Sequence, residues 1–121
     1  MPLVSRVDTV FMPAIDPIAA GAWYRQLFSM ETVFEEDDYV ALRFGGEPRS
    51  GTAITLYRAT VNRDAHPAFN FFADDVDLLR QTLITQGCEA TAIQRSGDML
   101  HLDFRDISGN WVNVCHFGRP A

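Results

Sequence analysis

The chain has 121 residues, of which 47% are hydrophobic, and this length suits one ordinary domain with a single core. Its 10 basic and 16 acidic residues give a formal net charge of −6, which repels polyanions and argues against nucleic acid as a partner. No apolar run approaches the roughly 20 residues that cross a bilayer, and the first residues lack the order of a secretion signal. We therefore expect a cytoplasmic protein that does not associate with a membrane.

The first predicted elements are a strand from Val7 to Ala14 and a helix from Pro17 to about Phe28. Asp16 suits the N-cap because its carboxylate can accept hydrogen bonds from the first turn, where Pro17 has no N–H to leave unbonded. The apolar stripe expected to lie on a sheet comprises Ile18, Ala22, Trp23, Tyr24, Leu27 and Phe28. Three strands follow at residues 31–35, 39–44 and 52–58, separated by turn-forming clusters at residues 36–38 and 45–48.

The same order of elements recurs 59 residues later (75 − 16), where Asp75 precedes a helix predicted from Val76 to about Gln86. Gly87 suits a left-handed helix stop. The strands of this second copy are predicted at residues 68–73, 90–94, 99–105 and 111–117.

Each copy is too small to bury its own sheet face, so the two copies must share a core. We predict an α+β fold in one domain of two tandem βαβββ modules, residues 7–58 and 67–117, joined by the linker 59–66. The eight strands are expected to form an open, mixed, β-barrel-like sheet with the helices outside. A cavity between the modules is the expected site of function.

Several segments resemble the vicinal oxygen chelate superfamily, which includes glyoxalase I, extradiol dioxygenases, and fosfomycin and bleomycin resistance proteins. The resemblance rests on Trp23-Tyr24 and Leu27–Met30 in the first helix, on Asp74–Asp77, and above all on Phe104–Asn110 before the final strand. It covers about Val7 to Phe117 and implies the fold above. Short members of the superfamily often form homodimers, so the resemblance also implies a homodimer. It says less about activity, since one scaffold carries several chemistries and some members only bind.

The resemblance also defines four metal-ligand positions, one on the first and one on the last strand of each half. Metal-dependent members carry His or Glu there, whereas this chain has Thr9, Thr55, Ala68 and Asn113. Hydroxyl, methyl and neutral amide groups cannot together hold a divalent ion tightly. We therefore expect no metal and no other cofactor. His66, before a proline in the linker, and His116, of opposite strand parity, are interpreted as surface or packing residues.

Period-two alternation extends the expected lining of the cavity beyond these four positions. Their neighbours two residues along the strands are Phe11, Tyr57, Asn70, Phe72, Trp111 and Cys115. The third strands add Arg43 in the first half and His101 and Asp103 in the second, with Arg43 and Asp103 interpreted as equivalent positions. An aromatic hollow with a few polar groups is typical of a small-molecule site, although the same aromatic residues also suit simple core packing.

Three functions remain open at this point. The first is a metal-free binding protein of the bleomycin-resistance type, which sequesters or carries a flat or aromatic ligand. The second is a metal-independent lyase, isomerase or hydrolase-type enzyme that uses His101 as acid or base, Asp103 to orient it and Arg43 to hold a substrate anion. The third is an accessory or interaction protein whose cavity is filled by its own side chains. Cys88 and Cys115 form no CxxC pair and are interpreted as buried small hydrophobic residues.

Overall fold

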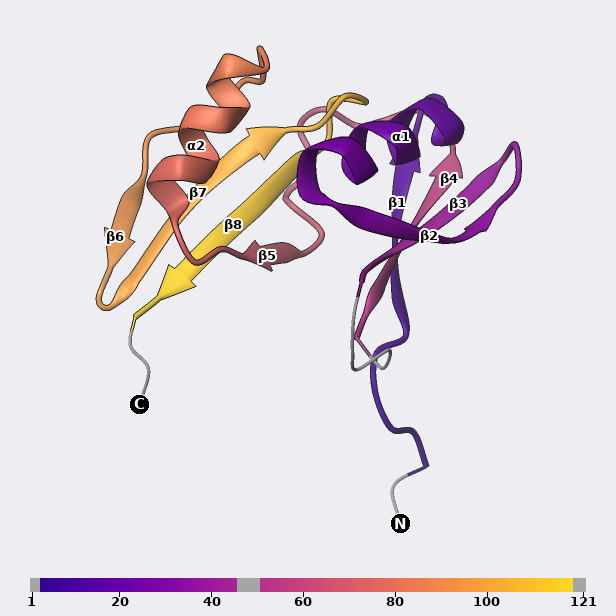
Figure 1. Ribbon diagram of the computed structural model, residues 1–121, viewed down its shortest axis with the longest axis horizontal. Coiled ribbons are helices and arrows are strands. Elements are labelled where there is room, and N and C mark those ends of the chain that lie inside the picture. Colours follow the sequence, from indigo (N-terminus) through magenta and orange to yellow (C-terminus); the bar gives the residue numbers. More distant parts are fainter. Residues whose placement is uncertain (1–2, 46–50, 119–121) are drawn as a thin grey trace. The chain divides into compact units, whose positions relative to one another are not determined.

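The computed structural model of the chain describes residues 3–45 and 51–118 (Figure 1). Within these ranges the chain forms eight strands and two helices, in two compact units that divide after Val61. Each unit contains one helix and one four-stranded mixed sheet. The predicted α+β fold of two βαβββ modules is therefore confirmed. Residues 46–48 of the predicted turn at 45–48 lie outside the described residues.

The sheet of the first unit has the strand order β1-β4-β3-β2. β1 (Thr9–Ala14) runs parallel to β4 (Ala53–Arg58), and β3 (Tyr39–Phe44) pairs antiparallel with both β4 and β2 (Met30–Glu35). α1 (Pro17–Phe28) has the bounds that the sequence predicts. Its N-cap is Asp16, whose carboxylate accepts a hydrogen bond from the backbone N–H of Ala19 at 3.3 Å.

The buried face of α1 differs from the predicted stripe. Pro17, Ala20, Gly21 and Tyr24 are buried, whereas Ala22 is exposed. A Cβ atom on Gly21 would lie 2.8 Å from Cγ1 of Val40, so the helix approaches β3 more closely than a side chain at this position allows. Small residues and the predicted Tyr24 therefore make up the buried face of the helix.

The sheet of the second unit has the strand order β5-β8-β7-β6. β5 (Asn70–Phe72) runs parallel to β8 (Trp111–Phe117), and β7 (Met99–Arg105) pairs antiparallel with β8 and with β6 (Gln94–Ser96). α2 (Val76–Thr85) begins at Asp75, which accepts a hydrogen bond from the N–H of Leu78 at 3.0 Å. Gly87 follows with φ of 84°, the left-handed conformation expected there. The buried apolar residues of this unit include Leu83, Leu102, Phe104, Val112 and Val114.

The strand predicted at residues 90–94 is displaced in the structure. β6 begins only at Gln94, and Ala90 makes an isolated bridge to Phe104. Between them, Thr91 bonds Asp103 once through its backbone N–H and once through its hydroxyl, which accepts from the N–H of Asp103 at 3.0 Å. A side-chain oxygen thus takes the place of a backbone carbonyl and interrupts regular pairing. No helix among the described residues is long and apolar enough to span a membrane.

Candidate functional site

One face of the second sheet presents its side chains in cross-strand rows. Because successive side chains of a strand alternate between faces, every second residue of β5, β7 and β8 shares this face. The strand register sets out the rows in order as Arg105–Trp111, Asp103–Asn113–Asn70, His101–Cys115–Phe72 and Met99–Phe117. The face thus has a polar centre between an arginine–tryptophan pair and an apolar end.

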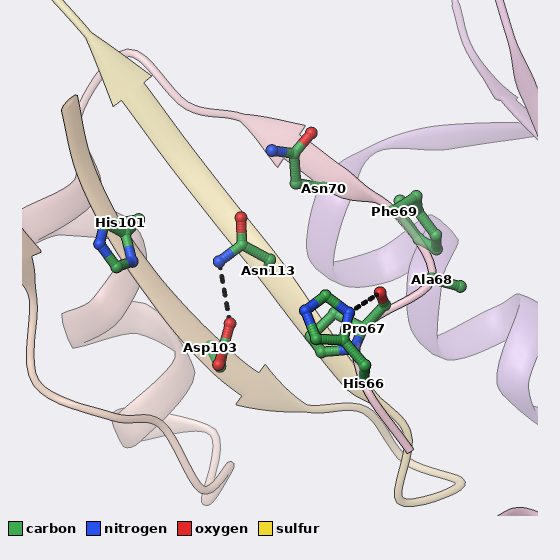
Figure 2. Close-up of a pocket in the computed structure, with 8 residues that line it drawn as sticks. All are labelled: His66, Pro67, Ala68, Phe69, Asn70, His101, Asp103 and Asn113. Atoms are coloured by element: carbon green, nitrogen blue, oxygen red, sulfur yellow. Dashed lines mark hydrogen bonds between the residues drawn. The ribbon is translucent and has the colours of Figure 1, made fainter. Parts of the chain in front are cut away.

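The polar centre of this face forms part of a pocket of about 520 Å³ (Figure 2). The rest of the lining comes from the segment that leads into β5. The lining residues are His66, Pro67, Ala68, Phe69, Asn70, His101, Asp103 and Asn113. The volume lies within the range of about 300–1,000 Å³ that is typical of small-molecule sites.

Asp103 and Asn113 are joined by a hydrogen bond in this pocket, drawn as a dashed line in Figure 2. Nδ2 of Asn113 donates to Oδ1 of Asp103 at 2.9 Å and to the backbone oxygen of Leu102 at 3.2 Å. Both partners can only accept, so the orientation of the amide is fixed and both of its N–H groups are used. The amide oxygen of Asn113 is the atom that remains for a ligand.

The two histidines of the pocket bond to different neighbours. Nδ1 of His66 lies 2.7 Å from the backbone oxygen of Pro67; since a carbonyl only accepts, Nδ1 carries a proton and donates it to this bond. Nε2 of His101 lies 3.2 Å from Oγ of Ser96 on β6. Within the described part of the chain no hydrogen bond joins His101 to Asp103, so the expected orienting contact is not formed.

The structure brings five of the twelve predicted site residues together in this pocket: Ala68, Asn70, His101, Asp103 and Asn113. Phe72 and Trp111 share the sheet face but lie outside the lining. His66, which the sequence predicts as a surface or packing residue of the linker, lies in the lining of the pocket. The sequence holds one signal for this position: His66 lies two residues before Ala68, and residues two apart on an extended chain point to the same side.

The other five predicted residues lie in the first unit: Thr9, Phe11, Arg43, Thr55 and Tyr57. The hydroxyls of Thr9 and Thr55 are 2.8 Å apart, and the rings of Phe11 and Tyr57 meet edge to face with centroids 6.4 Å apart. Nη2 of Arg43 lies 3.6 Å from the carboxylate of Asp8. These side chains form a group of their own on the first sheet.

The interpretation of Arg43 and Asp103 as equivalent positions is wrong. Thr55 faces Phe11 and Ala41 across its strand pairs, as Asn113 faces Asn70 and Asp103. Ala41 is therefore the counterpart of Asp103, and Arg43, two residues further along its strand, is the counterpart of Arg105. In both arginines Nε is buried and lacks a hydrogen-bond partner among the described residues, which agrees with this pairing.

The four positions that carry metal ligands in metal-dependent members do not suit an ion in this chain. The hydroxyls of Thr9 and Thr55 bond to each other, Ala68 has no side-chain donor, and the amide of Asn113 is held by its own two acceptors. Among the residues that the structure describes, no three His, Cys, Asp or Glu side chains gather closely enough to hold a metal. The metal-free state itself stays a prediction.

Solved structures that share this fold match nearly the whole chain. Lactoylglutathione lyase from Agrobacterium tumefaciens is 23% identical, with 95% of this chain and 96% of that chain covered and a TM-score of 0.72. The antibiotic-binding protein TnmS3 from Streptomyces sp. CB03234 is 16% identical, with 98% and 100% covered and a TM-score of 0.79. A glyoxylase/bleomycin resistance protein/dioxygenase domain from Frankia sp. EAN1pec is 17% identical, with 95% and 99% covered and a TM-score of 0.70.

No protein-family model and no curated protein sequence matches the chain. The similarity to solved structures therefore shows the fold, and it confirms the resemblance to the vicinal oxygen chelate superfamily at that level. What the pocket binds must be argued from its own side chains.

Proposed function

We propose that this protein binds a flat or partly aromatic small molecule in the pocket of its second unit, without a metal, and that binding rather than turnover is its function. The observation that carries the proposal is the pocket of about 520 Å³, which combines the ring of Phe69 with polar groups on Asn70, Asp103 and Asn113. The volume speaks against a cavity filled by the protein's own side chains. The antibiotic-binding protein of the same fold supports a role in binding.

The hydrogen bonds around His101 favour binding over acid–base catalysis. A catalytic base is usually oriented by a third group. Asp103, the expected orienting group, accepts from Asn113, and the ring of His101 contacts the hydroxyl of Ser96 on the edge strand β6. His101 therefore lacks the carboxylate contact that the enzyme hypothesis requires.

The proposal is tested by titrating the ¹⁵N-labelled protein with 2-naphthalenemethanol, a flat neutral probe, and following the side-chain amide signals of Asn70 and Asn113. We expect saturable shifts of both signals. Ala68→Trp places a large ring in the pocket and should weaken binding at least about tenfold, which is about 1.4 kcal/mol. The matched control is Ala92→Trp, at another exposed alanine of the same unit outside the lining, and it should bind as the parent does.

Two results would contradict the proposal. One is the absence of saturable shifts at the pocket amides, and the other is unchanged binding in Ala68→Trp. The alternative activity is checked with the hemithioacetal of methylglyoxal and glutathione, since one protein of this fold is a lactoylglutathione lyase. We expect no thioester product; product formation that His101→Ala abolishes would establish the enzyme instead.

We further propose that the protein acts as a homodimer in the cytoplasm. Large apolar side chains that are exposed in the single chain support a partner surface, among them Phe11, Phe72 and Phe117, which are 60%, 53% and 56% exposed. The acidic composition and the lack of a long apolar helix among the described residues agree with the proposed location.

A further inference from the structure

Acceptor oxygens outnumber N–H donors among the side-chain amides and the carboxylate of the pocket, because Asn113 uses both of its N–H groups within the protein and Asn70 keeps only its second N–H for a ligand. Asn113 directs both N–H groups to protein oxygens. Nδ2 of Asn70 is directed at a cysteine sulfur 3.5 Å away, and Nδ1 of His66 donates to a backbone oxygen. Among the described residues no donor reaches the amide oxygens of Asn70 and Asn113 or Oδ2 of Asp103. These three oxygens remain as acceptors for a ligand.

The charge of the pocket favours the same kind of ligand, one that brings hydrogen-bond donors. Asp103 is the one carboxylate in the lining, and it forms no ion pair within the described part of the chain. The positive residue nearest on its strand face is Arg105, whose Nη1 donates to the backbone oxygens of Arg63 and Gly109 at 2.7 and 2.8 Å. Nε of Arg105 lies 3.4 Å from the carboxylate of Glu89, which balances its charge. The carboxylate of Asp103 therefore keeps its attraction for a cation.

We propose that the pocket selects ligands that carry a cationic donor group, an ammonium or guanidinium, attached to the aromatic body. This inference rests on the proposed function and names the class of ligand. An ammonium has three donors and no acceptor, so it complements Oδ2 of Asp103 and the amide oxygens of Asn70 and Asn113. A carboxylate or phosphate on the ligand would place its own lone pairs against those of the three acceptor oxygens, and its negative charge would be repelled by the carboxylate of Asp103. The net charge of −6 on the chain acts in the same direction.

The test uses three probes with the same ring system: 2-naphthalenemethylamine, 2-naphthalenemethanol and 2-naphthoate, titrated at pH 8 and followed by the amide signals of Asn70 and Asn113. We expect the amine to bind at least about tenfold more tightly than the alcohol, and the carboxylate to bind most weakly. Asp103→Asn keeps the shape of the side chain and should reduce the preference for the amine to below about threefold.

Two further variants control the test. Asp98→Asn removes the same charge from an exposed turn of the same unit, outside the pocket, and should keep the preference for the amine. Asn70→Lys brings a cation to an exposed lining position and should reverse the order, so that naphthoate binds most tightly. Because Asn70 is exposed, this second variant does not depend on the fold tolerating a change at Asp103.

The outcomes separate this inference from the proposed function. Binding of the alcohol without a preference for the amine, or a preference that survives Asp103→Asn, overturns the cationic ligand class and leaves the binding function standing. Failure of all three probes to bind overturns both.

Discussion

Asp106 is a buried carboxylate that holds the loop between β7 and β8. It is 6% exposed and accepts hydrogen bonds from the backbone N–H groups of Ser108 and Asn110, each at 2.9 Å, and from Nδ2 of Asn110 at 3.1 Å. The two strands joined by this loop carry Asp103 and Asn113. A single side chain in the loop therefore helps to fix the register on which the pocket depends.

Asp106→Ala should lower the free energy of unfolding by about 3 kcal/mol, because it leaves several buried donors without an acceptor. Urea denaturation followed by circular dichroism measures the change. Asp98→Ala, at an exposed turn position, should stay within about 0.5 kcal/mol of the parent. Equal effects of the two substitutions would show that the loop does not need its carboxylate.

The two cysteines are free, and burial raises the pKa of both thiols above the ordinary value of a thiol. Cys115 is buried, as predicted, whereas Cys88 is half-buried and the pKa of its thiol is also raised, to a smaller extent, by the charge of Asp106. Folded protein should therefore react slowly with a disulfide reagent at pH 8 and rapidly once it is unfolded. A fast reaction of both thiols in the folded state would contradict this.

The same shifts make stability depend on pH in a defined direction. As pH rises through the ordinary titration range of a thiol, the unfolded thiols lose protons that the folded ones retain, so the unfolded state binds fewer protons and the free energy of unfolding falls. Well below that range this contribution is constant. Urea denaturation at pH 8 and about pH 9.5 should show a smaller decrease for Cys115→Ala than for the parent; identical decreases would argue against a thiol origin.

At the scale of elements, the contact of α1 with β3 depends on the missing side chain at position 21. A methyl group on Gly21 would lie 2.8 Å from Cγ1 of Val40. Gly21→Ala should therefore destabilise the protein by about 1–3 kcal/mol from overpacking, which outweighs a helix-propensity gain of about 1 kcal/mol at most. Val40→Ala in the same chain should relieve part of the loss, and thermal unfolding of the two single variants and the double variant measures the coupling. A more stable Gly21→Ala protein would refute close packing here.

Elements with strong local signals could be predicted from the sequence with their observed bounds. α1 begins where Asp16 caps it, and β3, β7 and β8 follow their alternation to the residue. The predicted position of β6 is wrong because the backbone N–H of Asp103 donates to the hydroxyl of Thr91 instead of to a backbone carbonyl of a paired strand. Strand propensities of the residues do not reveal such a bond.

Period-two patterns explain both the success and the error at the candidate site. Alternation identified which residues of β7 and β8 share a face, and three of these residues, His101, Asp103 and Asn113, meet in the pocket. A shift of two residues leaves such a pattern unchanged, however, so alternation could not decide whether Ala41 or Arg43 corresponds to Asp103. Only the pairing of strands resolves this. The path of the segment that carries His66 likewise depends on tertiary structure.

At the scale of the whole molecule, the two copies share their architecture and differ in their chemistry. Both begin their helix at an aspartate cap and both carry an arginine at the position of Arg43 and Arg105. The positions of Asp103, Asn70 and Asn113 are occupied in the first copy by Ala41, Phe11 and Thr55. The carboxylate and the two amides that line the pocket of the second copy thus have no equivalents at the corresponding positions of the first copy.

Native mass spectrometry of protein taken directly from cells addresses the assembly as a whole. We expect an ion of twice the chain mass without a stoichiometric divalent metal, because the four family ligand positions hold no imidazole or carboxylate. A retained small molecule that is lost in Ala68→Trp would locate the ligand. A monomer would refute the proposed dimer, and one retained nickel, zinc or iron per chain would refute the metal-free site.

The segment from His66 to Phe69 contributes half of the lining of the pocket and lies outside the helices and strands. His66, Ala68 and Asn70 are exposed, so exchanging them costs the core little. Natural variation or directed evolution can therefore retune what this scaffold recognises by altering a few consecutive positions. Descendants of one ancestor could in this way acquire different ligands while their architecture stays the same.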